Sequence, residues 1–377
     1  MPRYDFGSGR TDPSTFPYDE LAEAAKRAIP ALGEELVLYP GDYGHRGLRE
    51  VMAAREAKRE GVEVSADDIA LMNGSMQAVT LVAEALLEKP GDVIVCEELT
   101  YSGTLSAYKA LGARLVGVPV DGAGMRTDAL DQVMADLHAQ GTPPRFIYTL
   151  TTYQNPTGTV MPRARRLELL EVAKRYDAVV VEDNCYADVH FEGPVEPSLY
   201  ALDEYPNQIY LCSLSKILGP GIRLGYLKAP PALMQRLLAR RFDGGNSVLA
   251  AAVCAEFFRD SLWDHVLRTN VLLKQKRDLV FAGLETAADC TFTRPVGGMF
   301  VWVGFPEDVD RPRLWSLLQE EGVGVARGSA FHIDNADIPF LRLAFGYAGI
   351  DAVREGVPRL VECIGRARSG NDAVAAG

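Results

Sequence analysis

Short strand-like runs alternate with helix-like runs through the middle of this chain, and the alternation limits its fold more than any other feature. Amphipathic helical patterns at Met76–Leu87 and Arg163–Tyr176 lie between such strands. Strands separated by helices pair in parallel, and a parallel sheet is covered by helices on both faces. We therefore predict an α/β large domain over 39–255 with a mostly parallel sheet. Apolar, β-branched runs bounded by turn residues predict its strands at 91–98, 113–120, 145–152, 177–184, 207–215 and 223–230.

The pattern changes after Gly245. A long helical stretch over about 261–284 is followed by the strand-like runs "GGMFVWVGF" and "FLRLAFGYA", and by a last helix near 351–364. A chain of 377 residues also exceeds the roughly 250–300 at which a single core stops growing. We expect a second, smaller α+β domain made of 256–377 and of 1–38, whose Gly- and Pro-rich arm packs across the domain junction.

The composition argues against several classes of protein. A net charge of −12 opposes nucleic-acid binding, which needs a basic face. No apolar run approaches the roughly 20 residues of a membrane span, and the first ten residues lack the apolar core of a secretory signal. The six cysteines form no CxxC pair, so we expect reduced thiols in a cytoplasmic protein and no metal site. The charged run "AAREAKRE" at 53–60 is interpreted as the exposed face of a helix.

Polar residues follow several of the predicted strands directly, at the sheet edge where ligands of parallel sheets collect. The segment Asn73-Gly74-Ser75 ends one strand and opens a helix. The free N–H groups and the dipole of a helix N-terminus suit a phosphate, although Gly-Ser is also an ordinary turn and cap. Asn155 follows another strand in "YQNPTG", which taken alone is equally an ordinary loop.

Two further segments carry charges that are costly in an apolar setting. Asp183 emerges from a very apolar strand and needs either a cationic partner or a helix cap. Lys216 follows "YLCSLS", where desolvation lowers the pKa of a lysine, the condition for an amine that forms a Schiff base. The alternative is a structural lysine that reaches the surface. A phosphate beside Lys216 would find three further ligands in Ser213, Ser215 and Arg223.

These four segments together match the needs of pyridoxal phosphate. In such a site an aspartate pairs with the ring nitrogen and keeps the ring an electron sink. A lysine holds the aldehyde and then carries the proton during the reaction. Because a chance coincidence of all four is improbable, we predict pyridoxal phosphate as the cofactor and Lys216 as the residue that forms the Schiff base.

The sequence resembles the fold type I pyridoxal-phosphate enzymes, and within them the class I/II aminotransferases of the 2-aminoadipate and broad-range subgroup. The resemblance runs over nearly the whole chain and rests on "YPGDYGHRGLRE", "NGSMQA", "YQNPTGTVM", "VEDNCYADV", "SLSKILGPGIRLGY", "PVGGMFVWV" and "LRLAF". It implies a large domain with a mostly parallel sheet and a smaller α+β domain. It also implies a ping-pong transfer of an amino group between an L-amino acid and a 2-oxo acid through a Lys216 internal aldimine.

The resemblance also assigns binding roles. Arg342 matches the arginine that clamps the substrate α-carboxylate, and Asn155 and Tyr39 match further substrate positions. Tyr39 matches a tyrosine that a neighbouring subunit lends to the phosphate, which implies a homodimer with shared active sites. The positions that match catalytic residues are Lys216, Asp183 and Tyr186. The positions that match cofactor ligands are Gly74, Ser75, Met76, Gln77, Tyr101, Asn155, Asp183, Tyr186, Ser213, Ser215, Lys216, Arg223 and Tyr39.

Around the cofactor ring, the same resemblance implies a role for each side chain. Asp183 pairs with the pyridine nitrogen, and Asn155 and Tyr186 hydrogen-bond the 3-oxygen. Tyr101 stacks on the ring face, and Arg223 closes the phosphate nest together with the two serines.

Two departures from the subgroup leave substrate specificity open. The segment "YDFGSGRTDPSTFP" comes almost at once, without the helix that often precedes it, and Asp183 is followed by "NCY" where an acidic residue and proline are frequent. Arg10 and Arg327 fall in segments expected near the pocket, where each is either a ligand for an acidic side chain or a structural residue. Cys185 is interpreted as a packing residue, with a thiol near the cofactor as the alternative.

Two other functions stay open at this stage. The same cofactor and scaffold serve decarboxylases, racemases, lyases and oxidases that act on amino acids, because a fold does not dictate a reaction. Aminotransferase-like domains also occur as ligand-binding modules fused to DNA-binding regions, but no such region precedes Met1 and the charge is acidic. We expect an aminotransferase with small-molecule substrates and with no nucleic-acid or membrane partner.

Overall fold

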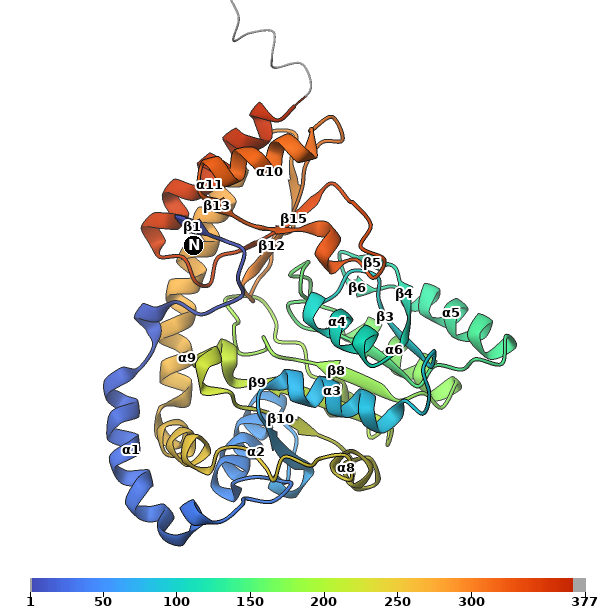
Figure 1. Cartoon of the computed structure of the whole chain (residues 1–377), viewed down its shortest axis with the longest axis vertical. Helices are drawn as coiled ribbons and strands as arrows, with labels where there is room; N and C mark the ends of the chain where they lie inside the picture. Colours follow the sequence, from blue (N-terminus) through green and yellow to red (C-terminus); the bar gives the residue numbers. More distant parts are fainter. Residues whose placement is uncertain (1, 369–377) are drawn as a thin grey trace, which may run out of the picture.

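A seven-stranded sheet forms the centre of the molecule (Figure 1). The computed structural model describes residues 2–368. The strand order is β2-β10-β9-β8-β7-β3-β4, and β10 runs antiparallel to both neighbours while the other six strands share one direction. The predicted mostly parallel sheet is therefore confirmed. Its strands are β2 (Ile69–Met72), β3 (Val93–Glu97), β4 (Arg114–Val118), β7 (Phe146–Thr149), β8 (Val180–Asp183), β9 (Gln208–Ser213) and β10 (Gly225–Lys228).

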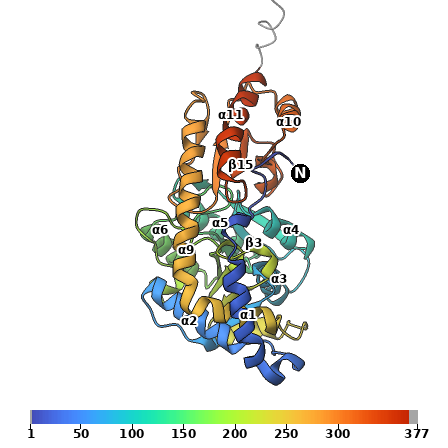
Figure 2. The same ribbon diagram turned by 90° about the vertical axis from the view of Figure 1, so that its left-hand side faces the viewer.

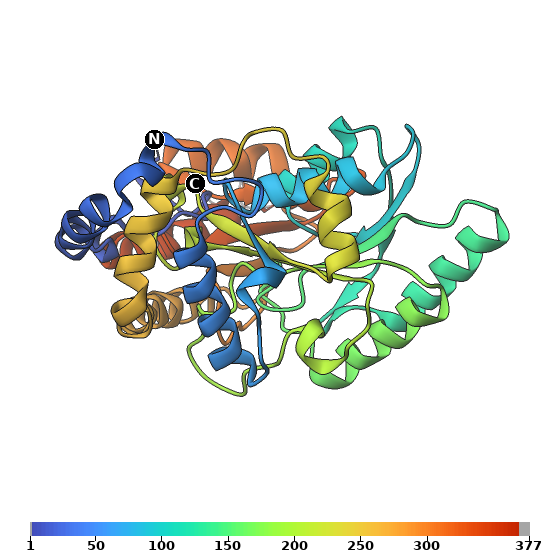
Figure 3. The ribbon, with the colours of Figure 1, turned by 90° about the horizontal axis from the view of Figure 1, so that it is seen from below.

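Helices cover both faces of this sheet, as the sequence predicts (Figure 3). Their apolar faces share cores with strands that are buried on both sides, which is why these strands are continuously hydrophobic. One face is covered by α3 (Ser75–Leu86), α4 (Ser102–Ala110) and α8 (Pro231–Leu238). The other face is covered by α5 (Thr127–Ala139), α6 (Arg163–Arg175), the short α7 (Leu199–Leu202), α2 (Arg46–Glu60) and the first part of α9 (Val248–Leu284).

The helix α9 is continuous over 37 residues and links the large sheet to a second, smaller layer (Figure 2). The sequence predicted its start near residue 261, but the Ser247 side chain accepts the Ala250 N–H and begins the helix earlier. A four-stranded sheet of order β11-β12-β15-β14 packs against its distal part. The elements of this layer are β11 (Thr291–Phe292), β12 (Phe300–Gly304), β14 (Ala326–Arg327), β15 (Phe340–Ala344), α10 (Arg311–Glu320) and α11 (Ile350–Arg366).

The N-terminal arm crosses between the two layers. Its strand β1 (Tyr4–Asp5) pairs in parallel with β13 (Val323–Gly324) of the smaller layer, whereas α1 (Tyr18–Leu32) packs along α9 beside the large sheet. A small hairpin, β5 (Val120–Asp121) with β6 (Gly124–Met125), completes the fold. Within residues 2–368, no helix is long and apolar enough to cross a membrane.

The predicted division into 39–255 and into 1–38 with 256–377 stays a prediction. Its boundary between 255 and 256 lies inside α9, and Met1 and residues 369–377 lie outside the described residues. The smaller layer is an α+β arrangement, as expected.

Four of the five charged side chains at 53–60 are almost fully buried and Lys58 is exposed, so the interpretation of the run as an exposed helix face was wrong for all but Lys58. Arg55 and Glu56 are only 3% and 0% exposed. The Arg55 Nε donates to Asp188 Oδ2 at 2.7 Å, and Arg59 Nε donates to Glu60 Oε1 at 2.8 Å. A buried charge is tolerated when it is paired and hydrogen-bonded, and here each has a partner that the helical pattern alone does not reveal.

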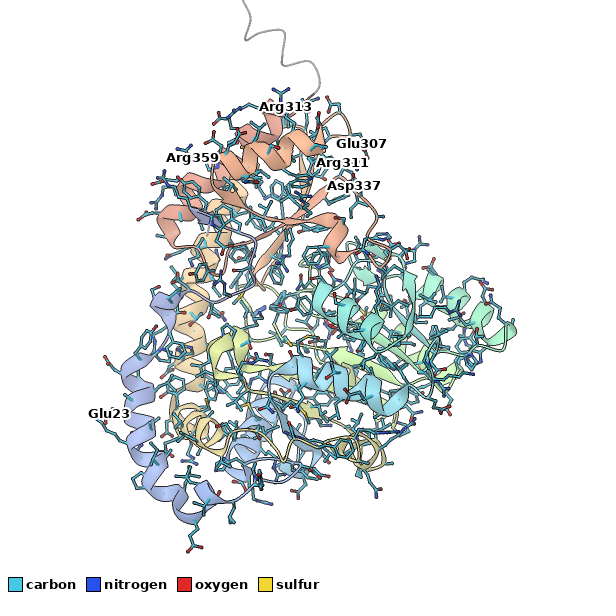
Figure 4. All side chains as sticks on the ribbon, viewed as in Figure 1. Glu23, Glu307, Arg311, Arg313, Asp337 and Arg359 are labelled. Carbon is cyan, nitrogen blue, oxygen red and sulfur yellow. The ribbon has the colours of Figure 1, made fainter. Side chains whose placement is uncertain are left out.

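Exposed ion pairs occupy the outer face of the smaller layer instead (Figure 4). Arg311 of α10 lies 3.0 Å from Glu307 and 2.7 Å from Asp337, both of which are largely exposed. Solvent-exposed pairs of this kind contribute at most about 1 kcal/mol each, so they do not decide the fold.

Candidate active site

A cavity lies at the carboxyl ends of β7, β8 and β9, where the sequence predicts ligand binding. Ten of the thirteen predicted cofactor ligands line it; nine of them stand at the end of a strand of the common direction or in the segment after one, and Arg223 stands just before β10. They are Ser75, Met76, Tyr101, Asn155, Asp183, Tyr186, Ser213, Ser215, Lys216 and Arg223. The remaining lining residues are Leu150, Cys185 and Pro220.

Lys216 lies in the short 3-10 turn Leu214–Lys216 that directly follows β9. The Ser213 side chain caps this turn by accepting the Ser215 N–H at 3.2 Å. The lysine Nζ donates to the Gly9 carbonyl at 2.7 Å and forms no salt bridge within the described residues. Burial lowers the pKa of this amine to about 8, as the sequence predicts for a desolvated lysine.

Asp183 is the last residue of β8, and its side chain is buried below the cavity. Tyr148 Oη donates to its Oδ2 at 2.7 Å, and Cys185 Sγ donates to its Oδ1 at 2.8 Å. Burial raises the pKa of this carboxyl, while the two hydrogen bonds and the charge of Lys216 oppose that rise.

The turn before α3 forms an anion nest closed by Arg223. Gly74 caps the helix with φ of +83°, a conformation that favours glycine. A Cβ at Gly74 would lie 2.7 Å from Arg223 Nη2, so the arginine can approach only because a glycine stands there. Arg223 Nη2 donates to the Asn73 carbonyl at 2.9 Å, and this bond holds its guanidinium beside the first turn of α3. The first N–H groups of a helix have no partner inside it and are available to an anion.

Gln77 and Tyr39 do not line the cavity. The Gln77 Oε1 accepts the Asn73 N–H at 2.7 Å, and its Nε2 donates to Asp243. Asp243 also accepts from the Asn73 side chain at 3.0 Å, so Gln77 and Asp243 brace the nest from outside. The Tyr39 side chain is 88% exposed and lies against Gly244.

Arg342 projects from β15 as a buried guanidinium with no salt bridge inside residues 2–368. Its Nη1 donates to Asn155 Oδ1 at 2.9 Å and its Nη2 to the Gly7 carbonyl at 2.7 Å, while Nε has no hydrogen-bond partner. The rings of Phe300 and Phe331 lie 4.4 and 4.7 Å from the guanidinium carbon. Burial lowers the Arg342 pKa to about 10, because a buried guanidinium loses the hydration that favours its charged form.

Arg10 and Arg327 are engaged elsewhere. The Arg10 Nη2 lies 2.7 Å from Asp5 and its guanidinium stacks on Tyr347. The Arg327 guanidinium stacks on Trp315, outside the cavity. Both contacts fit the structural alternative for these arginines.

Comparison with known proteins assigns the family. Residues 5–357 match the family described as aminotransferase class I and II. The chain belongs to this family. It is 32% identical to the 2-aminoadipate transaminase of Thermus thermophilus over 97% of this chain and 90% of that protein, and 33% identical to aromatic-amino-acid aminotransferase 1 of Thermococcus litoralis over 94% and 86%. The solved α-aminoadipate aminotransferase of Thermus thermophilus, complexed with N-(5'-phosphopyridoxyl)-L-leucine, is 30% identical with a TM-score of 0.87, over 96% of this chain and 92% of that one.

This aminotransferase is a pyridoxal-phosphate enzyme of fold type I, and its cavity fits that cofactor. The cavity reaches the first turn of α3 at Ser75 and Met76 beside Arg223, and Lys216 is a desolvated amine. Asp183 supplies a buried carboxylate to the same cavity. The residues present therefore offer a suitable group for the phosphate, the aldehyde and the ring nitrogen of a bound cofactor.

Sequence reasoning missed several residues of the aminotransferase site. Tyr148 lies inside a strand and looked like core, although a tyrosine so close to a strand end can reach the sheet edge. Cys185 was interpreted as packing, with a thiol near the cofactor as the alternative, and its place in the cavity and its contact with Asp183 fit that alternative. The arm residues Gly7 and Gly9 act through backbone carbonyls, which leave no signal in the side-chain pattern.

Proposed function

We propose that Lys216 is the residue of this aminotransferase that carries the amino-group transfer between an L-amino acid and a 2-oxo acid, in two half-reactions of a ping-pong route. The observation that carries this proposal is a desolvated lysine, without an ion pair among the described residues, in one cavity with a buried carboxylate. An amine with a pKa of about 8 is partly neutral near neutral pH, so it can act as a nucleophile and as a proton carrier.

The cavity residues would hold pyridoxal phosphate along its length. The bound cofactor supplies an aldehyde and an electron-withdrawing ring. Asp183 would accept a hydrogen bond from the ring nitrogen, and Asn155 and Tyr186 would contact the 3-oxygen. Tyr101 would lie on the ring face. The phosphate ligands would be the first turn of α3 at Gly74, Ser75 and Met76, with Ser213, Ser215 and Arg223; Gln77 would brace this turn from behind.

Arg342 would bind the α-carboxylate of the substrate. Its planar guanidinium can donate two parallel hydrogen bonds to a carboxylate, and its burial between two aromatic rings keeps competing water away. Asn155, which accepts from Arg342 Nη1, would orient the guanidinium. Arg342 does not itself line the cavity but contacts its lining residue Asn155, and there it would recognise the carboxylate that all α-amino acids share.

We further propose a cytoplasmic homodimer in which Tyr39 reaches the phosphate of the partner subunit. An exposed apolar surface supports this assembly: Val37, Tyr39 and Phe242 are 83%, 88% and 88% exposed. Contiguous exposed apolar surface is typical of a protein interface. Light scattering with size-exclusion chromatography should give twice the mass of 41.1 kDa for the wild type, and mixed dimers of Tyr39→Phe and Lys216→Ala chains should regain one intact site.

A substrate panel tests the reaction. The pure enzyme should lose the absorbance of its aldehyde form when an L-amino acid is added, and regain it with 2-oxoglutarate or pyruvate. Because relatives are named for aromatic amino acids and 2-aminoadipate, the panel starts with these. Release of carbon dioxide, ammonia or peroxide without reversal would replace transamination by another reaction of the same cofactor.

A further inference from the structure

Two hydrogen-bond donors hold the Asp183 carboxylate, one on each oxygen. Tyr148 Oη donates to Oδ2 at 2.7 Å, and Cys185 Sγ donates to Oδ1 at 2.8 Å. Tyr148 stands opposite Val181 in the parallel pair of β7 and β8. Side chains two residues apart on a strand share a face, so Tyr148 and Asp183 meet on the same side of the sheet.

The carboxylate depends on these donors because no cation lies within ion-pair distance of it among the described residues, and the charge of Lys216 acts on it only from further away. Asp183 is 5% exposed and forms no salt bridge among the described residues. Burial alone favours its protonated form, and hydrogen bonds to the ionised oxygens oppose this preference. A protonated Asp183 could not act as the anionic partner of a protonated ring nitrogen.

Burial favours the protonated, donating form of both groups. Burial raises the pKa of the Tyr148 hydroxyl and of the Cys185 thiol well above their ordinary values. The Tyr148 hydroxyl also lies 3.1 Å from Thr104 Oγ1. Since Tyr148 donates to Asp183, it accepts from Thr104, and the three groups form one directed chain.

We propose that Tyr148 and Cys185 are positioning residues that keep Asp183 ionised and aimed at the ring nitrogen of the cofactor. This inference rests on the proposed role of Asp183. It gives Cys185 a function that an alanine or a proline at this position would not provide.

The test measures the proton on the ring nitrogen directly. Apoenzyme is reconstituted with pyridoxal phosphate labelled with ¹⁵N in the ring, and the ¹⁵N chemical shift is followed against pH. Hydrogen bonds to charged groups are worth about 1.5–3 kcal/mol, so loss of the Tyr148 hydroxyl in Tyr148→Phe should move the ring-nitrogen titration down by about 1 to 2 pH units. Cys185→Ala should shift it in the same direction, and Cys185→Ser, which keeps a donor, should restore it.

Tyr108→Phe is the matched control. Tyr108 is a second buried tyrosine, its ring centroid is 5.6 Å from that of Tyr148, and its hydroxyl has no hydrogen-bond partner among the described residues. Removing that hydroxyl makes the same chemical change without touching Asp183, so the ring-nitrogen titration should stay at the wild-type pH. Activity gives a second measurement: Tyr148→Phe should lower kcat and leave the substrate KM nearly unchanged, because Arg342 is untouched.

The ring-nitrogen titration of the wild type distinguishes a failure of the proposed role of Asp183 from a failure of the inference about its two donors. If wild-type enzyme binds the cofactor but leaves its ring nitrogen unprotonated, the proposed role of Asp183 fails. If the wild type is protonated and Tyr148→Phe and Cys185→Ala titrate like it, the inference about the two donors is wrong. Should Tyr148→Phe not fold, the pair Cys185→Ala and Cys185→Ser decides alone, since equal titrations for that pair contradict the inference.

Discussion

Replacing Arg342 by lysine tests the substrate end of the site. The arginine offers two Nη groups, placed by Asn155 at 2.9 Å and by the Gly7 carbonyl at 2.7 Å. A lysine keeps the charge but has one nitrogen in place of a planar fork. Loss of one charge-assisted hydrogen bond to the substrate carboxylate costs about 1.5–3 kcal/mol, so we expect kcat/KM to fall by about 10- to 150-fold.

The assay compares two substrates of the same side chain. One is a good L-amino acid, and the other is the amine that lacks its α-carboxylate. Arg342→Lys should lower kcat/KM for the amino acid and leave the value for the amine nearly unchanged. Arg327→Lys is the control, because Arg327 lies on the neighbouring strand β14 but stacks on Trp315 outside the cavity. An equal loss with both substrates would refute the carboxylate contact and indicate damage to the fold.

Three further substitutions and one pH profile test the cofactor end. Lys216→Ala should abolish turnover and still bind cofactor without a covalent link, so borohydride should no longer attach the cofactor to the protein; an active variant would overturn the assignment. Burial lowers the Lys216 pKa to about 8, so the rate at which the apoenzyme captures the cofactor should rise about tenfold per pH unit below pH 8 and level off above it. A rate that keeps rising to about pH 10.5 would show that the lysine is unperturbed. Asp183→Ala should slow turnover by orders of magnitude, and near-normal rates would show that Asp183 does not face the ring. Gly74→Ala places a Cβ 2.7 Å from Arg223 at a residue with φ of +83°, which adds strain of about 1–3 kcal/mol and should weaken cofactor binding about 5- to 150-fold. Gly61→Ala is the control: Gly61 has a similar φ of +72° but open space around it, so cofactor binding should not change.

The strands and the residues at their ends were predictable because the signals are local. An apolar run followed by a polar residue marks where a buried strand reaches the sheet edge, and the parallel topology collects these edges in one place. This rule alone was enough to place Asp183, at the end of β8, close to Lys216, which follows β9. Gly74 was predictable for the same reason, since it stands between a strand and a helix.

Contacts between distant segments were not predictable from such local signals. The burial of Arg55 depends on Asp188, 133 residues further along the chain, and the segment "AAREAKRE" contains no signal that predicts this partner. Gln77 is the third residue of α3 and was expected at the phosphate, but its side-chain amide donates to Asp243 outside the cavity. In each case the position of the side chain is set by a residue that is distant in the sequence and lies close to it only in the folded chain.

The N-terminal arm shows how such a distant contact completes the site. Lys276 of α9 is fully buried and holds Asp12 of the arm at 2.6 Å, and this ion pair fixes the segment that precedes it. The Gly7 and Gly9 carbonyls then contact Arg342 and Lys216, each at 2.7 Å. A carbonyl is a neutral acceptor, so it orients a cation without cancelling its charge. The arm therefore orients both Lys216 and Arg342, the two cations to which we assign the cofactor and the substrate carboxylate, and this is why a Gly- and Pro-rich segment outside the large sheet belongs to the proposed site.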